Sequence, residues 1–319
     1  MKKYLLLIIT VLLTACSGTA ANVSDKPDKH DSHHGSDQIT ITDFADRTLS
    51  FPSPPERIIA LSNGDMDIIY ALESELVGRP TTRGVLSVPE AESVEQIGST
   101  HEFDLEKVTY LRPDVVLGNY PMNQKDIETI ASIDSQLVLT NANSIDDITK
   151  QITLYGDLLQ KQEKAEQLKE TIEHKVTSIQ NKPLPEEVRV LLVYGAPGTY
   201  MVALPNSLSG NMLDTIGVKN IAADFPQLEH YPQYAQLNTE RIIEANPQVV
   251  LLMVHGNPES VKEGFIKEME QNAAWNNIDA VINNQIEILP THLFGTNPGT
   301  QITEALDHLY EILLEVESP

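Results

Sequence analysis

The sequence predicts an α/β protein of two lobes, each with a parallel-type sheet flanked by helices, joined by one long helix. Three observations carry this prediction. Short apolar runs alternate with helical patterns, a helix–proline–strand unit occurs twice, and a long amphipathic segment lies between the two copies. Strands that alternate with helices are typical of parallel sheets covered on both faces.

The first fifteen residues have the pattern of a signal peptide. Lys2 and Lys3 precede an apolar run over residues 4–13, which is shorter than the roughly 20 residues that span a bilayer. The run ends in Leu13-Thr14-Ala15-Cys16, which resembles a bacterial lipobox. That resemblance implies cleavage before Cys16 and acylation of its thiol, for example with palmitate. The alternative is an ordinary signal peptide followed by an incidental cysteine.

Residues 16–37 are expected to form a lipidated cysteine and a flexible tether, because they are polar and almost free of apolar side chains. The tether contains His30, His33 and His34, which suit a solvated linker or weak metal capture. Cys16 is the only cysteine, so disulfides are excluded. The net charge of −24 argues against nucleic-acid partners, which need basic surfaces.

Residues 38–145 are predicted to form the N-terminal lobe. Alternating apolar residues indicate a hairpin over residues 38–51, and Asp104 is a plausible N-cap for a helix that Pro113 ends. The remaining pattern predicts strands at 57–61, 75–79, 115–117 and 136–139, and helices from Met66 and over 124–132.

A helical segment over residues 146–182 is predicted to link the lobes, with an interruption near Gly156 and a second helix from about Gln162. Residues 183–319 then form the C-terminal lobe. The pattern there predicts strands at 188–193, 249–253 and 285–289, and helices at 212–216, 261–270 and 301–316.

An internal repeat supports two lobes of similar build. Residues 104–108 and 113–117 correspond to residues 238–242 and 247–251 without a gap, at a spacing of 240 − 106 = 134 residues. Helix start, helix stop and strand therefore recur in register. Coincidence between two ordinary helix–proline–strand units is the alternative.

With its lipobox, joining helix and repeated unit, the chain resembles the iron-chelate and cobalamin class of ABC-importer binding proteins. Residues 193–203, 254–259 and 294–295 are similar to segments of the haem-binding lipoproteins of iron-regulated surface determinant systems. The resemblance implies a ligand in the cleft between the lobes and small hinge motion. It also implies that Glu106 and Glu240 dock onto arginines of the permease. Without it, both are glutamates favoured by the helix dipole.

The resemblance implies haem as the ligand, held by axial side chains in an apolar slot. His255 follows a predicted strand at the position of the family's second-lobe ligand. His101 stands where close relatives carry a methionine. Either it ligates, giving bis-histidine iron of lower potential than a His/Met site, or it only lines the cleft. Met66 is the substitute candidate.

Four further residues are candidates for the haem pocket. His292 follows a strand end, and Tyr231 lies with His230 and Tyr234 in a loop broken by prolines. Tyr200 belongs to a segment that carries the resemblance, and Asn63 precedes Gly64 at a helix start that could offer N–H donors to a propionate.

Other functions remain open at this point. A ferric siderophore or cobalamin would suit the same class, but only Arg79 and Arg83 lie near loop positions suited to anionic chelates. No motif of a hydrolase or phosphate-binding enzyme is present. A zinc or manganese binder would need clustered histidines and carboxylates. The sequence therefore predicts a monomer at the outer face of the cell membrane, held there by its lipid only. It would pass haem to an ABC permease and could receive it from surface haem donors.

Overall fold

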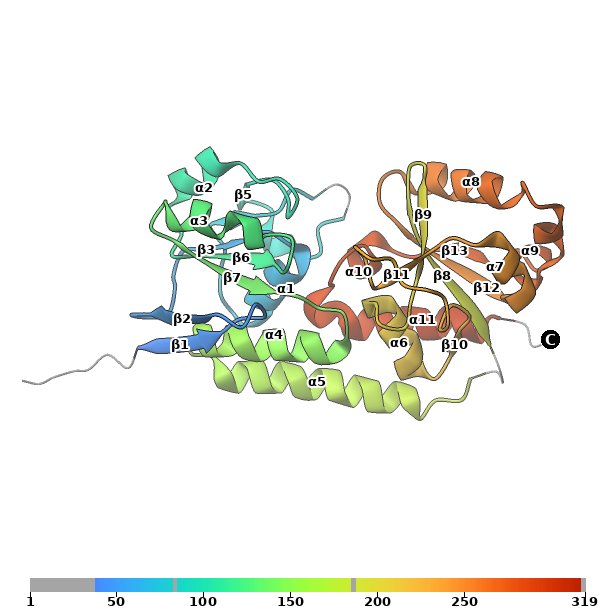
Figure 1. Cartoon of the computed structure of the whole chain (residues 1–319). Coiled ribbons are helices and arrows are strands. Elements are labelled where there is room, and N and C mark those ends of the chain that lie inside the picture. Colours follow the sequence, from blue (N-terminus) through green and yellow to red (C-terminus); the bar gives the residue numbers. More distant parts are fainter. Residues whose placement is uncertain (1–37, 83–84, 185–187, 317–319) are drawn as a thin grey trace, which may run out of the picture. The chain divides into compact units, whose positions relative to one another are not determined.

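The computed structural model describes residues 38–82, 85–184 and 188–316 (Figure 1). A five-stranded parallel sheet in the order β5-β4-β3-β6-β7 organises the first lobe. The predicted signal peptide, Cys16 and the histidines of the predicted tether lie outside the described residues. The elements of this lobe are β1 (Ile39–Thr42), β2 (Thr48–Phe51), β3 (Ile58–Ala60), α1 (Asn63–Ala71), β4 (Gly78–Arg79), η1 (Pro89–Ala91), β5 (Glu95–Gln96), α2 (Leu105–Leu111), β6 (Val115–Asn119), η2 (Gln124–Asp126), α3 (Ile127–Ala131) and β7 (Gln136–Thr140).

The first sheet is covered on both faces, as its apolar strands predict. Successive residues of β6 are buried in different clusters: Val115 and Leu117 in one, Val116 in the other. This alternation follows from the period of two in a strand. The predicted hairpin over residues 38–51 is confirmed, because β1 pairs antiparallel with β2. The strand predicted at 75–79 is shorter, since only Gly78–Arg79 pairs.

Two helices, α4 (Ile145–Leu158) and α5 (Gln162–Gln180), follow the first lobe. They pack side by side (Figure 1). Gly156 lies inside α4 and does not interrupt it. A Cβ at this position would come within 2.5 Å of the Ala165 Cβ of α5, so the glycine permits close packing. The break comes instead after Leu158, where Gln160 adopts φ +54.

The long joining helix predicted from the sequence is α5. Its 19 residues span about 28 Å at 1.5 Å per residue. Near its start, Lys164 pairs with Glu73 of the first lobe at 2.7 Å. Near its end, Lys175 pairs with Asp307 of the second lobe at 2.5 Å. The helix therefore contacts both lobes along its length.

The second lobe contains a mixed sheet in the order β11-β9-β8-β12-β13, with β10 also pairing with β8. Its elements are β8 (Arg189–Ala196), β9 (Thr199–Ala203), α6 (Leu208–Ile216), β10 (Lys219–Asn220), β11 (Tyr234–Gln236), α7 (Thr239–Ala245), β12 (Val249–Val254), α8 (Pro258–Met269), η3 (Ala273–Asn277), α9 (Asp279–Ile282), β13 (Ile286–Ile288), α10 (Thr291–Phe294), η4 (Gly299–Gln301) and α11 (Ile302–Leu314).

Strands β9 and β11 were not foreseen, and β9 runs antiparallel to both of its neighbours, β8 and β11, in this parallel-type sheet. The cause is the turn at Pro197-Gly198, where Gly198 has φ +75. A two-residue connection can join only antiparallel strands, because a parallel crossover needs a dozen or more residues. The core strands β8, β12 and β13 are parallel, as predicted.

The internal repeat is confirmed in the backbone. The side chains of Asp104 and Asn238 cap α2 and α7 by accepting the backbone N–H three residues on. At the opposite ends, Arg112 and Asn246 adopt left-handed conformations with φ 44 and 45. The proline that follows each of them excludes further helix. Equivalent residues thus begin and end both helices.

One apolar core runs through both lobes and the joining helices. It includes Met66 of α1, Tyr155 of α4, Leu192 of β8 and Leu309 of α11. The turn η4, which precedes α11, packs against α1 of the first lobe. None of the described helices is both long and apolar enough to cross a membrane.

Candidate functional site

His101 lies at the tip of a tight loop between β5 and α2. Gly98 adopts φ +107, and a Cβ there would come within 2.5 Å of the Glu102 carbonyl oxygen, so the turn requires glycine. The Thr100 hydroxyl donates to the Leu61 carbonyl at 2.9 Å, directly after β3. The His101 side chain is exposed. The loop is thus tied to the carboxyl end of the first parallel sheet.

His255 follows β12 directly, at the carboxyl end of the second sheet. Its backbone N–H donates to the Gly195 carbonyl of β8 at 2.8 Å, which extends the β8–β12 ladder by one bond. Gly256 has φ +115, and a Cβ there would lie 3.5 Å from the Pro197 ring. Among the described residues the exposed imidazole has no hydrogen-bond partner. The backbone is therefore fixed while the side chain is available.

The two histidines occupy comparable places in different lobes. Parallel strands present their carboxyl ends at one edge, which is where open α/β sheets bind ligands. Each loop is held by bonds within its own lobe. Within the described ranges, His, Cys, Asp and Glu side chains form no group of three or more that could hold a bare metal ion. A porphyrin needs only axial side chains, because its ring supplies the other ligands.

His292 and the two tyrosine candidates lie on different parts of the second lobe. His292 is half-buried on the short helix α10, just after β13, so it shares the carboxyl edge with His255. Tyr200 lies on β9 and faces α8, where its hydroxyl donates to the Val261 carbonyl at 3.2 Å. Its ring packs edge-on against Phe265 at 5.7 Å.

Tyr231 belongs to a group of three tyrosines beside β8 and β11. Its side chain is 58% exposed, and its carbonyl accepts the Tyr234 N–H. The ring of Tyr234 packs against that of Tyr194 at 5.7 Å. Burial raises the pKa of Tyr234 to about 12, with a smaller contribution from Tyr194, so its hydroxyl keeps its proton. Tyr231 is the most exposed of the three, since Tyr194 and Tyr234 are half-buried.

Asn63 begins α1, immediately after the Ser62 N-cap. Its side-chain oxygen is buried and has no hydrogen-bond partner among the described residues. The next residue, Gly64, lies so close to Asn297 that a Cβ would come within 2.6 Å of the Asn297 carbonyl oxygen. The start of α1 is therefore packed against the second-lobe segment that precedes α11.

A buried polar network, which sequence reasoning missed, surrounds Asp65. Its carboxylate accepts from Gln151 Nε2 and from the Tyr155 hydroxyl, both at 2.6 Å, and more weakly from Thr140. Gln151 Oε1 in turn accepts from Asn297 Nδ2 at 2.8 Å. The network joins α1, β7 and α4 of the chain's first half to the second lobe. Gln151 and Tyr155, four residues apart in an amphipathic helix, were the signal available in the sequence.

Burial raises the pKa of Asp65, and the hydrogen bonds oppose that effect only in part. Asp67, two residues further along α1, accepts both the backbone N–H and the hydroxyl of Thr300, at 2.5 and 2.8 Å. Burial raises its pKa to about 6. Two buried carboxyl groups of one short helix thus hold the second lobe.

Arg79, a candidate cation for an anionic chelate, is only 5% exposed. Its guanidinium donates to the carbonyls of Ala91, Pro80 and Glu92 at 2.8 to 3.3 Å. These bonds occupy the guanidinium N–H groups within the first lobe. Arg83 lies outside the described residues.

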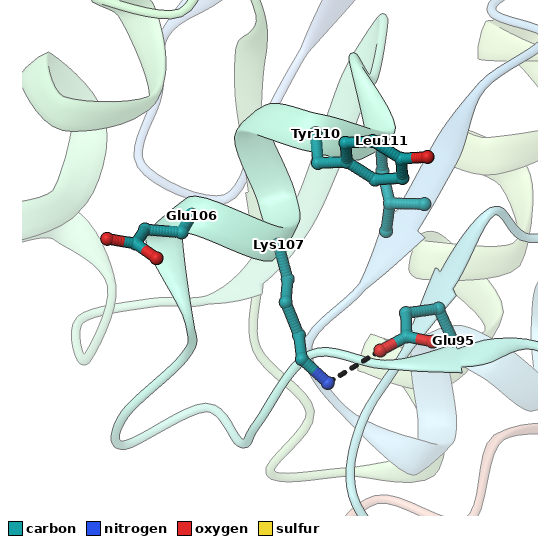
Figure 2. Close-up of a pocket in the computed structure, with 5 residues that line it drawn as sticks. All are labelled: Glu95, Glu106, Lys107, Tyr110 and Leu111. Atoms are coloured by element: carbon teal, nitrogen blue, oxygen red, sulfur yellow. Dashed lines mark hydrogen bonds and ion pairs between the residues drawn. The ribbon is translucent and has the colours of Figure 1, made fainter.

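Glu106 and Glu240 occupy the same position in the first turns of α2 and α7, and both are exposed. The cation that follows each is held by another acidic residue. Lys107 pairs with Glu95 at 2.5 Å, and Arg241 with Asp224 at 3.5 Å. Figure 2 shows the Glu106 carboxylate directed away from the Lys107–Glu95 pair.

Hollows of about 510 and 210 Å³ lie beside α2 and α7 respectively. The candidate haem ligands line neither. Among the described residues no ion pair joins Glu106 or Glu240 to a cation, so both carboxylates are available to a partner.

Residues 58–293 match the periplasmic binding protein family. The high-affinity heme uptake system protein IsdE of Staphylococcus aureus strain Newman is 27% identical over 314 residues, 97% of each chain. The crystal structure of S. aureus IsdE complexed with heme matches with TM-score 0.70 and 27% identity, over 81% of this chain and 99% of that one.

An ABC transporter substrate-binding protein from Listeria monocytogenes matches with TM-score 0.68 and 27% identity, over 82% and 98% of the chains. S. aureus SirA complexed with staphyloferrin B matches with TM-score 0.70 over 86% and 98%, but at 19% identity it shows the fold alone. These relatives are transport components and not enzymes. The chain belongs to the periplasmic binding protein family, as an extracytoplasmic substrate-binding protein of the iron-chelate and cobalamin class that serves ABC transporters.

Proposed function

We propose that this chain is a lipid-anchored haem-binding protein that captures haem outside the cytoplasm and delivers it to an ABC permease. The observation that carries the proposal is the likeness over 97% of both chains to a heme uptake protein, combined with the position of His255. That histidine stands at the carboxyl edge of the second sheet with a fixed backbone and an unpartnered imidazole. A neutral imidazole is a strong axial ligand for haem iron.

His101 is proposed as the second axial ligand, from the carboxyl edge of the first sheet. Its loop is anchored through Thr100, so an exposed imidazole is presented without loss of backbone order. His292, Tyr231 and Asn63 are proposed to line the pocket. Tyr200 would contribute to the pocket through the backbone of β9, because its hydroxyl is already hydrogen-bonded to α8.

A siderophore is the competing ligand in this class. Anionic chelates need cations that are free to bind them. The internal bonds of Arg79 remove one of the two arginines that could have served. This favours haem.

The test is a haemin titration of the protein after Cys16, followed by absorbance. A Soret band that saturates at one equivalent, with low-spin bands and without the long-wavelength sulfur-to-iron band of a methionine ligand, is expected. His255→Ala should weaken binding by about tenfold or more, since an axial bond is lost. The matched control is His174→Ala, an exposed histidine of α5. Wild-type affinity and an unchanged Soret band in His255→Ala would refute the assignment.

Delivery is proposed to use Glu106 and Glu240 as contacts for permease arginines, with Cys16 holding the protein at the outer face of the membrane. Exposed carboxylates at matching places on the two lobes set the orientation of a partner more than its affinity. Changing both to alanine should stop haem-iron uptake while haem binding is kept. Glu170→Ala, on the exposed face of α5, is the control. Undiminished uptake by the double variant would exclude this docking mode.

A further inference from the structure

We infer that Leu105 and Tyr110 make the first-lobe docking surface an apolar one, whereas the equivalent surface of the second lobe docks through charge alone. The two surfaces thereby distinguish the two halves of the permease. This inference rests on the proposed docking through Glu106 and Glu240, and it concerns neighbouring residues that the proposal does not use.

Helix α2 exposes an unusual amount of apolar surface for its size. Tyr110 is 85% exposed and Leu105 is 38% exposed. They are two of the seven large apolar side chains exposed among the described residues, and both lie on a helix of seven residues. Tyr110 follows Glu106 by four residues, so the two share one face. A large exposed aromatic beside a charged docking residue is typical of an interface.

The surroundings of Tyr110 give a partner side chain a place to enter. The hollow of about 510 Å³ is lined by Glu95, Glu106, Lys107, Tyr110 and Leu111 (Figure 2). Lys107 is held by Glu95, and this bond raises the pKa of its ammonium group. Among these five residues the unpaired charge is therefore Glu106, about one helical turn before Tyr110. An arginine flanked by apolar side chains complements this combination.

The second lobe carries different chemistry in the same register. Thr239 stands where the first lobe has Leu105, and Glu244 where it has Tyr110. Glu240 and Glu244 are both exposed and four residues apart, so two carboxylates share one face. The Arg241 guanidinium lies 4.3 Å from the Phe225 ring and is paired with Asp224. This surface offers negative charge and no exposed aromatic on α7.

The difference bears on orientation because Glu106 and Glu240 alone are interchangeable. A permease with two similar halves could dock either lobe on either half. With the observed side chains, reversed docking would bury the Glu244 carboxylate in an apolar site and leave Tyr110 against a cationic one. Burial of an unpaired charge and loss of an aromatic contact both oppose that orientation.

The experiment measures the affinity of the full-length haem-loaded protein for its purified permease–ATPase complex in nanodiscs, at low and at high salt. Tyr110→Ala should weaken binding by about tenfold at both, because an aromatic anchor is insensitive to screening. Glu244→Gln should weaken binding by about threefold at low salt only. Ile282→Ala, 65% exposed on α9, is the apolar control and should bind as wild type.

A paired exchange, Tyr110→Glu with Glu244→Tyr, tests orientation directly. It should bind more tightly than either single variant, because the reversed orientation then matches both halves of the permease. Haem content and circular dichroism verify folding, which these exposed positions should preserve. Binding by Tyr110→Ala within twofold of wild type would overturn the inference. If the Glu106→Ala, Glu240→Ala double variant also bound normally, the proposed docking itself would fail. If the double variant did not bind while Tyr110→Ala bound normally, the proposed docking would stand and only the role of Tyr110 would be refuted.

Discussion

The two copies of the helix–proline–strand unit have the same backbone conformation but differ in their contacts with the rest of their lobes. In the first lobe, Asp114 accepts the N–H groups of Glu56 and Arg57, and the Arg57 side chain donates to carbonyls at the end of α2. In the second, Gln248 accepts the N–H of Arg189, whose side chain donates to the end of α7. The same local signals thus produce the same element twice.

The two copies differ in the side-chain contacts that their arginines make. Arg189 also pairs with Asp279 of α9, at 2.7 Å, and Asp279 bonds to both ends of the Asn246 amide. Arg57 has no such carboxylate partner among the described residues. The comparison teaches that the repeat determines secondary structure, whereas attachment to the rest of the fold is specific to each lobe.

Helices α1 and α6 show the same division. Each is capped by a serine, Ser62 or Ser207, that accepts the N–H three residues on at 3.1 Å. Helix α1 places buried Asp65 and Asp67 at the contact with the second lobe. Helix α6 has Gly210 and Met212 at the matching positions. Of these two helices, only α1 therefore contributes buried carboxyl groups to the contact between the lobes, here called the joint.

The largest loss of stability is expected from a substitution that disrupts this joint. Asp65→Ala should lower the free energy of unfolding by about 3 kcal/mol, because the buried donors of Gln151 and Tyr155 lose their acceptor. Urea unfolding measures it. Ser209→Ala, a buried polar position of α6 with no such network, should cost about 1 kcal/mol or less. Equal losses in the two variants would contradict the asymmetry.

The two arginines sharpen the comparison of the repeated units. Arg189→Ala should cost about 2 kcal/mol, since it also leaves the Asp279 carboxylate without its cation. Arg57→Ala should cost about 1 kcal/mol, because it removes only hydrogen bonds to exposed carbonyls. Both are measured by chemical unfolding under the same conditions. A larger loss for Arg57→Ala would reverse the ranking.

Asp67 should give the joint a pH dependence, whereas the matching residue of α6 is the uncharged Met212. Its folded pKa of about 6 lies above its ordinary value of 3.8, so the folded state binds its proton more tightly than the unfolded state. The contribution to stability is fully present below about pH 4 and is lost as the pH rises through 6. Relative to Asp67→Asn, wild type should gain about 1 kcal/mol between about pH 7 and pH 5. Parallel stability profiles for the two proteins would exclude this titration.

The smallest effect tests the equivalence of the two units. Asp104→Ala and Asn238→Ala each remove an N-cap bond of 3.1 and 3.0 Å, and each should cost about 1 kcal/mol. Thermal unfolding compares them. A difference of more than about twofold would show that the caps are not equivalent despite their matching register.

Much of the first lobe could be predicted because its signals are local. Apolar runs gave β3, β6 and β7, and Asp104 with Pro113 bounded α2. In the second lobe, β9 and β11 escaped prediction, since Pro197-Gly198 was not recognised as a hairpin turn. Gly156 was assigned to a helix break, although its role in packing depends on Ala165 of a different helix. Packing partners distant in sequence leave no local pattern.

By itself, the sequence determined the α/β class, the repeated unit and the positions of Glu106 and Glu240, because caps, prolines and strand periodicity act over a few residues. It also nominated His101 and His255 through their places after predicted elements and through resemblance. Only the tertiary structure decided that Arg79 is occupied internally, that Tyr200 is bonded to α8, and that Asp65 and Asp67 join the lobes. Each of these outcomes depends on contacts between residues that are far apart in the sequence. A polar group that such contacts bury must hydrogen-bond within the fold, whereas a group left exposed can bind a ligand.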